Sequence, residues 1–550
     1  MTAQVDVRPL LPSTSRVVVD APARRRNRSW ELYFLAVVAT YLYALLGWWL
    51  KYHFHFTIGD SLARTNDAKA MLFSRDPHAA AIGVYWMPLP TLAQLPFVAI
   101  LEPLRHVEYA GPLSTAFFGG GTVWVLGKLA RDLGLSRLTS FLIAAAYGVN
   151  PVIAYFAANG MSEAAEFFFM ALALWGLLRF LRDDRNSSAV ITAIGLAGLT
   201  MSKYEAAPVI LLACVVLLFM HLRKLPRGQW HEPVLNMAII ALPAVFFVTV
   251  WLIYQKLILG SFFAFRHVSV ITGSDARSQV SGLLGSAGGT ANFVARWVFM
   301  FFPAAVLVLP ALFVAPWRKM LAGFAVAATG VLAILATAYY IYKGHSVGEP
   351  RYFTPVIVVG TVAVIVAASR LPSRSISHLI IDPAAVIAIL VAAYSGTIAE
   401  AGNTTSVEGE QRVFQLAEGM YNDHPDPNNA DAASYIAAKK MDSLLRPGDR
   451  IFVDERYDPD MVLFSYKPGQ IVTNSDRDYE QLASPTGIEA RIGWAVVPAS
   501  LGRGLNINDD DGYLLVHRQS GWSEVWHNNR IEIWQRDPAS LAGLPMPPRG

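Results

Sequence analysis

The sequence contains several apolar runs that are long enough to cross a lipid bilayer as helices. A helix needs about 20 predominantly apolar residues to span the hydrocarbon core, and the runs at 30–50, 234–258 and 320–342 reach that length. Charged residues make up only 16% of the chain, whereas about a quarter of the residues in a soluble domain are charged. A soluble globular fold is therefore excluded, and the sequence predicts a polytopic α-helical membrane protein.

Lysine and arginine residues collect beyond alternate ends of these runs. We predict about eleven membrane spans, because the basic residues alternate with the runs as the positive-inside rule requires. The spans are expected near residues 30–50, 109–128, 138–157, 164–181, 188–202, 205–221, 234–258, 293–315, 320–342, 352–369 and 379–396. The Arg-rich residues 1–29 are expected to form a disordered cytoplasmic N-terminus without a cleaved signal peptide. The apolar residues 88–104 are short and interrupted by proline, so we expect a re-entrant or interfacial segment there.

The first polar loop and the end of the chain lie on the outer side in this scheme. The membrane domain is expected at 30–396 and includes a first outer loop at 51–108, whereas residues 397–550 have the patterning of a soluble domain. The elements predicted within that domain are a helix at 429–445 and strands at 450–453 and 530–534. We therefore expect a small extracytoplasmic α/β domain at the C-terminus.

Ionisable residues gather on the same outer side. Charges at membrane depth are costly, so such residues are functional candidates by default. The candidates and the tyrosines beside them are Asp60, Arg64, Asp67, Arg75, Glu163, Lys203, Tyr204, Glu205, Arg266, His267, His345, Glu349, Arg351 and Tyr352. Carboxylates and cations above an apolar bundle suit a lipid-phosphate substrate, whose tail would lie between helices and whose phosphate would face the cations.

Three of these candidates share one face of a predicted helix in the first outer loop. Asp60, Arg64 and Asp67 follow one another at intervals of four and three residues. Each also has a plainer explanation. Asp60 could close a capping box that begins at Thr57, Arg64 could be the i+4 ion-pair partner of Asp60, and Asp67 could lie on a solvated face.

Three further candidates also leave two interpretations open. Glu163 could cap the start of its span rather than contact a substrate. Lys203 could simply pair with Glu205, although charges in membranes usually serve function. Arg351 is the preferred phosphate ligand, and its alternative is an interfacial arginine that snorkels to the membrane surface.

Short motifs on the outer side follow one another in a definite order. They are Gly59-Asp60, Tyr85-Trp-Met-Pro-Leu-Pro90, Ser162-Glu163, Lys203-Tyr204-Glu205 and Pro350-Arg351-Tyr352. In this order and on this shared side, over residues 30–396, the pattern resembles the GT-C glycosyltransferases, in particular the protein O-mannosyltransferases and the lipid A aminoarabinose transferases. The resemblance implies a GT-C-like membrane domain.

The resemblance also implies a polyprenyl-phosphate-linked sugar donor and transfer to an acceptor hydroxyl on the extracytoplasmic face. It makes Asp60 the single general base, because Gly59 stands where the family usually has another acidic residue. Arg64, Lys203 and Arg351 would then contact the donor phosphate, and the other candidates would line the substrate site. No cofactor is firmly implied, and the use of a divalent metal is left open.

The expected partners are the lipid-linked donor, a glycan, protein or lipid acceptor, and the lipids of a bacterial plasma membrane. No nucleic-acid partner is expected, and the formal net charge of +4 is modest. Two other functions stay open. A lipid-linked-sugar flippase or transporter would carry charges at mid-span and on both faces, and a non-catalytic membrane scaffold would tolerate the change Asp60→Asn.

Overall fold

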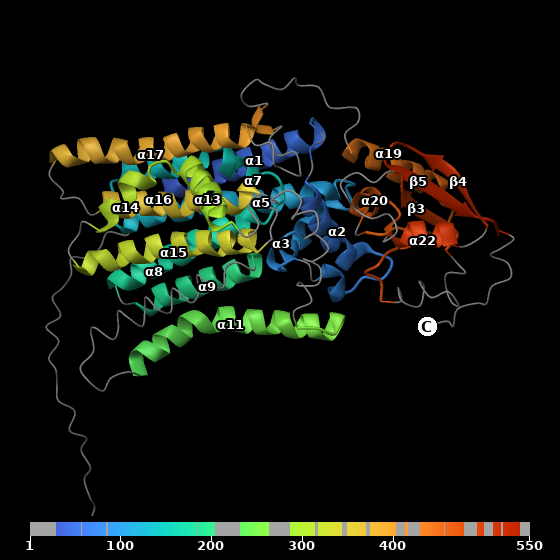
Figure 1. Ribbon diagram of the computed structural model, residues 1–550, viewed down its shortest axis with the longest axis horizontal. Coiled ribbons are helices and arrows are strands. Elements are labelled where there is room, and N and C mark those ends of the chain that lie inside the picture. The colour runs from blue at the N-terminus through green and yellow to red at the C-terminus, as the bar shows by residue number, and fades with distance from the viewer. Residues whose placement is uncertain are drawn as a thin grey trace, which may run out of the picture.

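The computed structural model consists of a long helix bundle, a first loop region beside its end, and a small mixed domain beyond that region (Figure 1). The structure describes residues 29–54, 56, 58–83, 86–183, 185–203, 231–262, 286–313, 317–343, 349–369, 375–402, 413–415, 430–455, 457–477, 492–499, 510–518 and 521–538. The end of the bundle next to the small domain is called the domain end below.

Twelve of the described helices form the bundle. They are α1 (Trp30–Tyr52), α5 (Ala110–Asp132), α6 (Arg137–Gly148), α7 (Pro151–Phe156), α8 (Glu163–Asp183), α9 (Asn186–Ser202), α11 (His231–Leu259), α13 (Ala287–Phe301), α14 (Ala305–Phe313), α15 (Trp317–Tyr342), α16 (Pro355–Ala368) and α17 (Ser375–Ala401). Among the described residues, six helices are long and apolar enough to cross a membrane. The apolar segments of α8 and α16 are 72% and 83% buried, against 22% for α1 and 17% for α11, so α8 and α16 form the centre and α1 and α11 the periphery.

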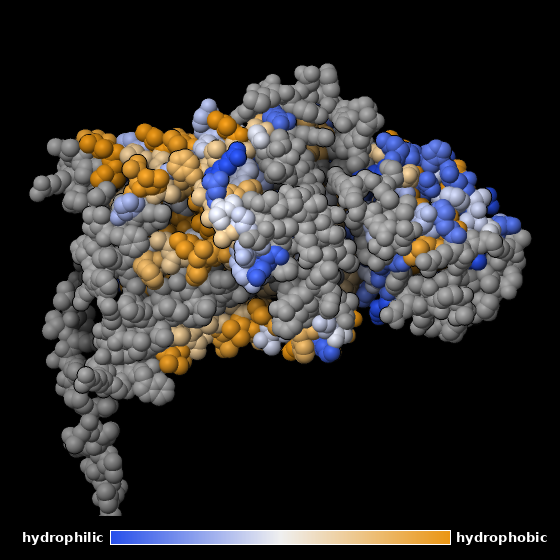
Figure 2. Space-filling model, viewed as in Figure 1, coloured by the Kyte–Doolittle hydropathy of each residue, from blue (hydrophilic) through white to orange (hydrophobic). Residues whose placement is uncertain are grey.

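The outer surface of the bundle is strongly hydrophobic. Large apolar side chains such as Val37 on α1, Leu242 on α11 and Leu379 on α17 are more than half exposed. Figure 2 shows hydrophobic residues spread over the bundle and hydrophilic residues over the small domain. An apolar surface of this extent needs lipid around it, and the prediction of an integral membrane protein is confirmed.

Helices occupy the predicted spans that fall within the described residues, but two of the spans are broken. The predicted span 138–157 divides into α6 and α7, because Asn150 caps the new helix through Val152 N–H and Pro151 cannot continue the old one. The predicted span 293–315 divides into α13 and α14 around Pro303. The predicted span 205–221 lies outside the described residues, and the count of eleven stays a prediction.

The first loop region lies between the bundle and the small domain (Figure 1). It contains α2 (Gly59–Phe73), η1 (Ala79–Ile82), α3 (Leu89–Leu92), α4 (Leu95–Leu101) and η2 (Val107–Tyr109). The segment predicted to be re-entrant or interfacial forms the short helices α3 and α4. Ile100 and Leu104 at the end of this segment are 63% and 60% exposed, which suits a segment that meets lipid.

The C-terminal domain is a mixed sheet with helices. Its elements are α19 (Ala430–Leu444), β1 (Ile451–Phe452), α20 (Pro459–Phe464), η5 (Pro468–Gln470), β2 (Ile471–Val472), β3 (Trp494–Pro498), α22 (Asp511–Arg518), β4 (Trp522–His527) and β5 (Ile531–Arg536). The strand order is β2-β1-β3-β5-β4; β1 is parallel to β2 and β3, and β5 is antiparallel to β3 and β4. The predicted α/β domain is confirmed, with α19, β1 and β5 at the predicted helix and strands.

The C-terminal domain and the first loop region share one hydrophobic core. Leu62 and Ala68 of α2 are buried in the same cluster as Met441, Leu463 and Ile533 of the domain. The helix that carries Asp60 is therefore packed into the domain as well as lying against the bundle.

Candidate active site

Asp60, Arg351 and Glu349 form a chain of charges at the domain end of the bundle. Asp60 lies in the first turn of α2, and Arg351 lies in η4 (Pro350–Phe353), which leads into α16. The Arg351 Nη2 atom is 3.2 Å from Asp60 Oδ2, and Arg351 Nε is 2.5 Å from Glu349 Oε2. The side chains of Arg351 and Glu349 are only 7% and 5% exposed, whereas that of Asp60 is 20% exposed. Asp60 is thus the accessible member of the chain.

A second chain of charges lies between α8 and α9. Lys203 Nζ is 2.9 Å from Glu163 Oε1 and 3.3 Å from Glu166 Oε2. Tyr352 connects the two chains, since its ring centroid is 5.6 Å from Lys203 Nζ and 5.4 Å from Arg351 Cζ. The structure therefore brings together Asp60, Glu163, Lys203, Glu349, Arg351 and Tyr352, from four separate parts of the predicted membrane domain.

Arg64 borders this centre one turn along α2 from Asp60. Its guanidinium Cζ is 4.4 Å from the centroid of the Trp86 ring, and its Nη1 atom is 3.9 Å from Met161 Sδ. No ion pair between described residues joins Arg64 to Asp60, so the simple i+4 pairing is wrong. Ile58 takes the N-cap position of α2, and Thr57, the first residue of the predicted capping box, lies outside the described residues.

The loop before α8 rests directly on the first turn of α2. Gly160 has a φ of +83°, and a Cβ atom there would lie 2.1 Å from Ser61 Oγ. Only glycine combines that backbone conformation with that close approach at little cost. Gly160 therefore allows the loop before Glu163 to pack against the turn that carries Asp60.

Asp67 and Arg75 extend from this helix toward the C-terminal domain. Burial raises the pKa of Asp67 well above its usual value, the Glu455 carboxyl of the domain adds to this shift, and Arg64 opposes it. Arg75 forms an ion pair of 2.8 Å with Asp476. Arg75 follows the end of α2, which is about 20 Å from Asp60 along the helix, so the structure places Arg75 in the interface with the domain and not beside Asp60.

Five predicted site residues lie outside the described residues. They are Tyr204, Glu205, Arg266, His267 and His345. The alternative pairing of Lys203 with Glu205 is therefore untested, although Lys203 does pair with Glu163 and Glu166. The alternative role of Glu163 as a simple cap does not account for this ion pair.

Sequence reasoning missed Glu166 and Glu455. Glu166 is three residues after Glu163 in α8, and this helical spacing could have identified it as a neighbour. Glu455 accepts a hydrogen bond of 3.3 Å from Asn66 Nδ2, across 389 residues of sequence. No local signal connects two residues so far apart.

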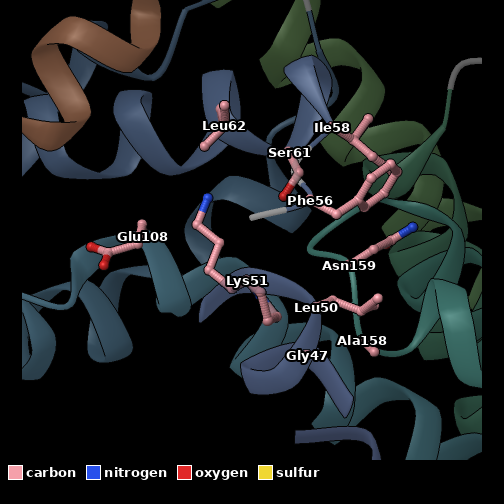
Figure 3. Close-up of a pocket in the computed structure, with 11 residues that line it drawn as sticks. Gly47, Leu50, Lys51, Phe56, Ile58, Ser61, Leu62, Glu108, Ala158 and Asn159 are labelled. Atoms are coloured by element: carbon pink, nitrogen blue, oxygen red, sulfur yellow. The ribbon is translucent and has the colours of Figure 1, made fainter. Parts of the chain in front are cut away.

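A small, open pocket lies behind the first turn of α2, between that turn and the end of α1 (Figure 3). Ile58 and Ser61 line it on either side of Asp60 in the sequence, but Asp60 is not among its lining residues. In Figure 3 the Lys51 ammonium and the Ser61 hydroxyl point toward the space between α1 and α2. The pocket therefore borders the turn that carries the candidate base without including it.

The described residues contain no group of three or more His, Cys, Asp or Glu side chains arranged to hold a metal ion. What the described centre does offer is a partly accessible carboxylate, Asp60, paired with the buried Arg351, with the ion-paired Lys203 in the same centre. Such a centre can accept a proton and can stabilise a phosphate charge.

A family model and solved structures resemble this chain. The model for dolichyl-phosphate-mannose-protein mannosyltransferase matches residues 105–252. The crystal structure of ArnT from Cupriavidus metallidurans bound to undecaprenyl phosphate has a TM-score of 0.56 and 13% identity, covering 92% of this chain and 98% of that one. The apo structure of the same protein has a TM-score of 0.51 and 13% identity, covering 94% and 99%. Comparison with curated proteins gives no match.

At 13% identity the ArnT structures show the fold of this chain, and the family model independently matches part of its membrane region. The likeness extends over nearly the whole length of both chains, the C-terminal domain included. The chain therefore has the fold of these ArnT structures.

Proposed function

We propose that this protein is a membrane glycosyltransferase that moves a sugar from a polyprenyl-phosphate donor to an acceptor hydroxyl. The observation that carries the proposal is the ion-paired centre, in which Asp60 lies 3.2 Å from the buried Arg351. Two comparisons support it: the matching family model is named for a dolichyl-phosphate sugar donor, and the similar ArnT structure contains undecaprenyl phosphate.

In the proposed reaction, an acceptor hydroxyl attacks the anomeric carbon of the donor sugar. The bond between that carbon and the phosphate oxygen breaks, and the polyprenyl phosphate leaves with the bonding electrons. Asp60 takes the hydroxyl proton as the new glycosidic bond forms. Its Oδ2 atom faces Arg351, and a carboxylate has a second oxygen that can accept from the hydroxyl.

Arg351 and Lys203 would stabilise the leaving phosphate. A guanidinium carries five N–H donors in a planar fork, so Arg351 can bind phosphate oxygens while it keeps its contact with Glu349. Lys203 lies near the same Tyr352 ring as Arg351 and would add a second positive charge beside the phosphate. Both side chains are at least 88% buried, and charge interactions are stronger at such sites than in water.

We further propose that the reaction occurs on the extracytoplasmic face. Asp60, Glu163, Lys203 and Arg351 all lie at the domain end of the bundle, and the distribution of lysine and arginine in the sequence favours an outer location for that end. The C-terminal domain would then shape the path by which the acceptor reaches Asp60.

The experiment that tests this proposal is turnover of radiolabelled polyprenyl-phosphate sugars by the purified protein. The assay measures release of lipid phosphate and appearance of a new labelled glycan, lipid or protein. We expect release of lipid phosphate with at least one donor. If the protein moves intact donor across the membrane of proteoliposomes and cleaves none of the donors, the result would instead support a flippase.

A further inference from the structure

The helix that carries Asp60 presents a second face to the C-terminal domain. Asp60 and Arg64 face the charged centre, whereas Asn66 and Lys69 contact residues of the domain. Leu62 on this second face is buried in the shared hydrophobic core. α2 is therefore packed between the bundle and the domain.

Lys69 makes the most deeply buried of these contacts. Its side chain is 1% exposed, and its Nζ atom lies 3.3, 3.0 and 2.9 Å from the carbonyl oxygens of Val462, Leu463 and Ser465. These carbonyls belong to the end of α20, where backbone acceptors lack partners within the helix and the helix dipole is negative. Lys69 thus caps a helix of the C-terminal domain from a helix of the first loop region.

A third segment, which follows α4, also contacts the Lys69 ammonium. Glu102, immediately after α4, has its Oε1 atom 3.2 Å from Lys69 Nζ. Burial lowers the pKa of Lys69 from its usual value, and Glu102 opposes this shift. A buried ammonium is tolerated only where acceptors of this kind surround it, so Lys69 fixes α2, α4 and α20 relative to one another.

We propose that Lys69 is a positioning residue, through which the C-terminal domain holds α2 in the register that places Asp60 beside Arg351. Lys69 is nine residues after Asp60, which is about 14 Å along a rigid helix. A displacement of the helix at Lys69 therefore reaches Asp60 without being absorbed by a flexible segment. Misplacement of a reacting group by about 1 Å can reduce the rate on the order of 100-fold.

The domain supplies a matched control for this role. Lys439 of α19 donates a hydrogen bond of 2.7 Å to the carbonyl of Phe464, which is also at the end of α20. Lys439→Met therefore removes a lysine cap from the same helix end but leaves α2 untouched. A residue that served only to stabilise the domain would behave as Lys439 does.

The first measurement is hydrogen–deuterium exchange of the purified full chain, which requires no substrate. We expect Lys69→Met to increase exchange in residues 59–73 and to leave α5 unchanged, whereas Lys439→Met leaves both unchanged. Equal exchange of residues 59–73 in Lys69→Met and wild type would overturn the proposal. This measurement does not depend on the proposed glycosyltransferase function.

The second measurement rests on that function and uses whichever donor the wild-type protein turns over. We expect Lys69→Met to lower kcat on the order of 100-fold, with the donor KM unchanged, and Lys69→Arg to restore part of the rate. Lys439→Met keeps the wild-type kcat. A Lys69→Met protein with wild-type kcat, or a loss matched by Lys439→Met, would overturn the proposal.

A second variant keeps the test decisive if Lys69→Met does not fold. Asn66→Ala removes the hydrogen bond to Glu455 from the same face of α2 and leaves Lys69 in place. We expect a smaller fall in kcat with unchanged donor KM and raised exchange in residues 59–73. Wild-type exchange and wild-type kinetics of Asn66→Ala would contradict the proposal that the C-terminal domain positions α2.

Discussion

Replacement of Arg351 by glutamine tests whether this residue contributes both to the stability of the fold and to sugar transfer. Arg351 contacts Asp60 at 3.2 Å and Glu349 at 2.5 Å, and its side chain is 7% exposed. With an effective dielectric constant of about 20, the attraction to Asp60 alone is about 5 kcal/mol before desolvation is subtracted. Removal of one partner from a buried ion pair costs about 3–5 kcal/mol, because the other charge stays buried and uncompensated.

We therefore expect Arg351→Gln to lower both the melting temperature and the turnover number. The loss of one group that stabilises developing charge reduces kcat by about 100- to 1000-fold. The double variant Arg351→Gln/Glu349→Gln separates the two effects, since it also removes the uncompensated Glu349 carboxylate. Its melting temperature should recover toward that of wild type, while its turnover stays low.

The assay pairs thermal unfolding in detergent with release of polyprenyl phosphate from the active donor. Arg351→Lys serves as the charge-preserving control. It should retain more activity than Arg351→Gln but less than wild type, because lysine lacks the bidentate geometry of the guanidinium. Wild-type turnover in Arg351→Gln, or recovery of turnover in the double variant, would refute the assignment of Arg351 as a phosphate ligand.

Three further changes have defined expected outcomes. Gly160→Ala should lower turnover by more than Gly134→Ala, because both glycines have positive φ but only at Gly160 would a Cβ meet another residue, Ser61 Oγ; melting temperatures and initial rates of the two variants provide the comparison. Burial raises the pKa of Glu455 to about 7 from its usual 4.5, so its protonated form adds stability at low pH that is lost as the pH rises through 7. The melting temperature of wild type should consequently fall relative to that of Glu455→Gln between about pH 5 and pH 8, and parallel curves would contradict the burial of this carboxyl. Lys203→Met should raise the donor KM and lower kcat together, and kinetics with unchanged KM would remove Lys203 from the donor site.

Much of the fold follows from the sequence because membrane helices are specified locally. The apolar runs and their basic flanks identify helices such as α1, α8 and α11 within a few residues. The division of the predicted span 138–157 at Asn150-Pro151 could also have been anticipated, since proline cannot continue the preceding helix. The length of the apolar run favoured one continuous span, although Asn150 and Pro151 lie inside it.

The site was only partly predictable, because its ion pairs join residues that are far apart in the chain. The one-sided gathering of charges identified Asp60, Glu163, Lys203 and Arg351 as candidates, but it did not show which carboxylate faces which cation. The role of Lys69 was hidden because a lone lysine on a polar helix looks solvated. Its burial depends on α20, almost 400 residues later, and no periodicity in the sequence reports that contact.

The most direct test of the central claim compares Asp60→Asn and Asp60→Glu with wild type under single-turnover conditions. Donor affinity is measured separately, by displacement of a labelled polyprenyl phosphate. If Asp60 accepts the hydroxyl proton, Asp60→Asn binds the donor as wild type does but transfers the sugar about 100- to 10,000-fold more slowly, and Asp60→Glu recovers part of the rate. Transfer by Asp60→Asn at the wild-type rate would contradict the claim and would move the base to another carboxylate of the centre.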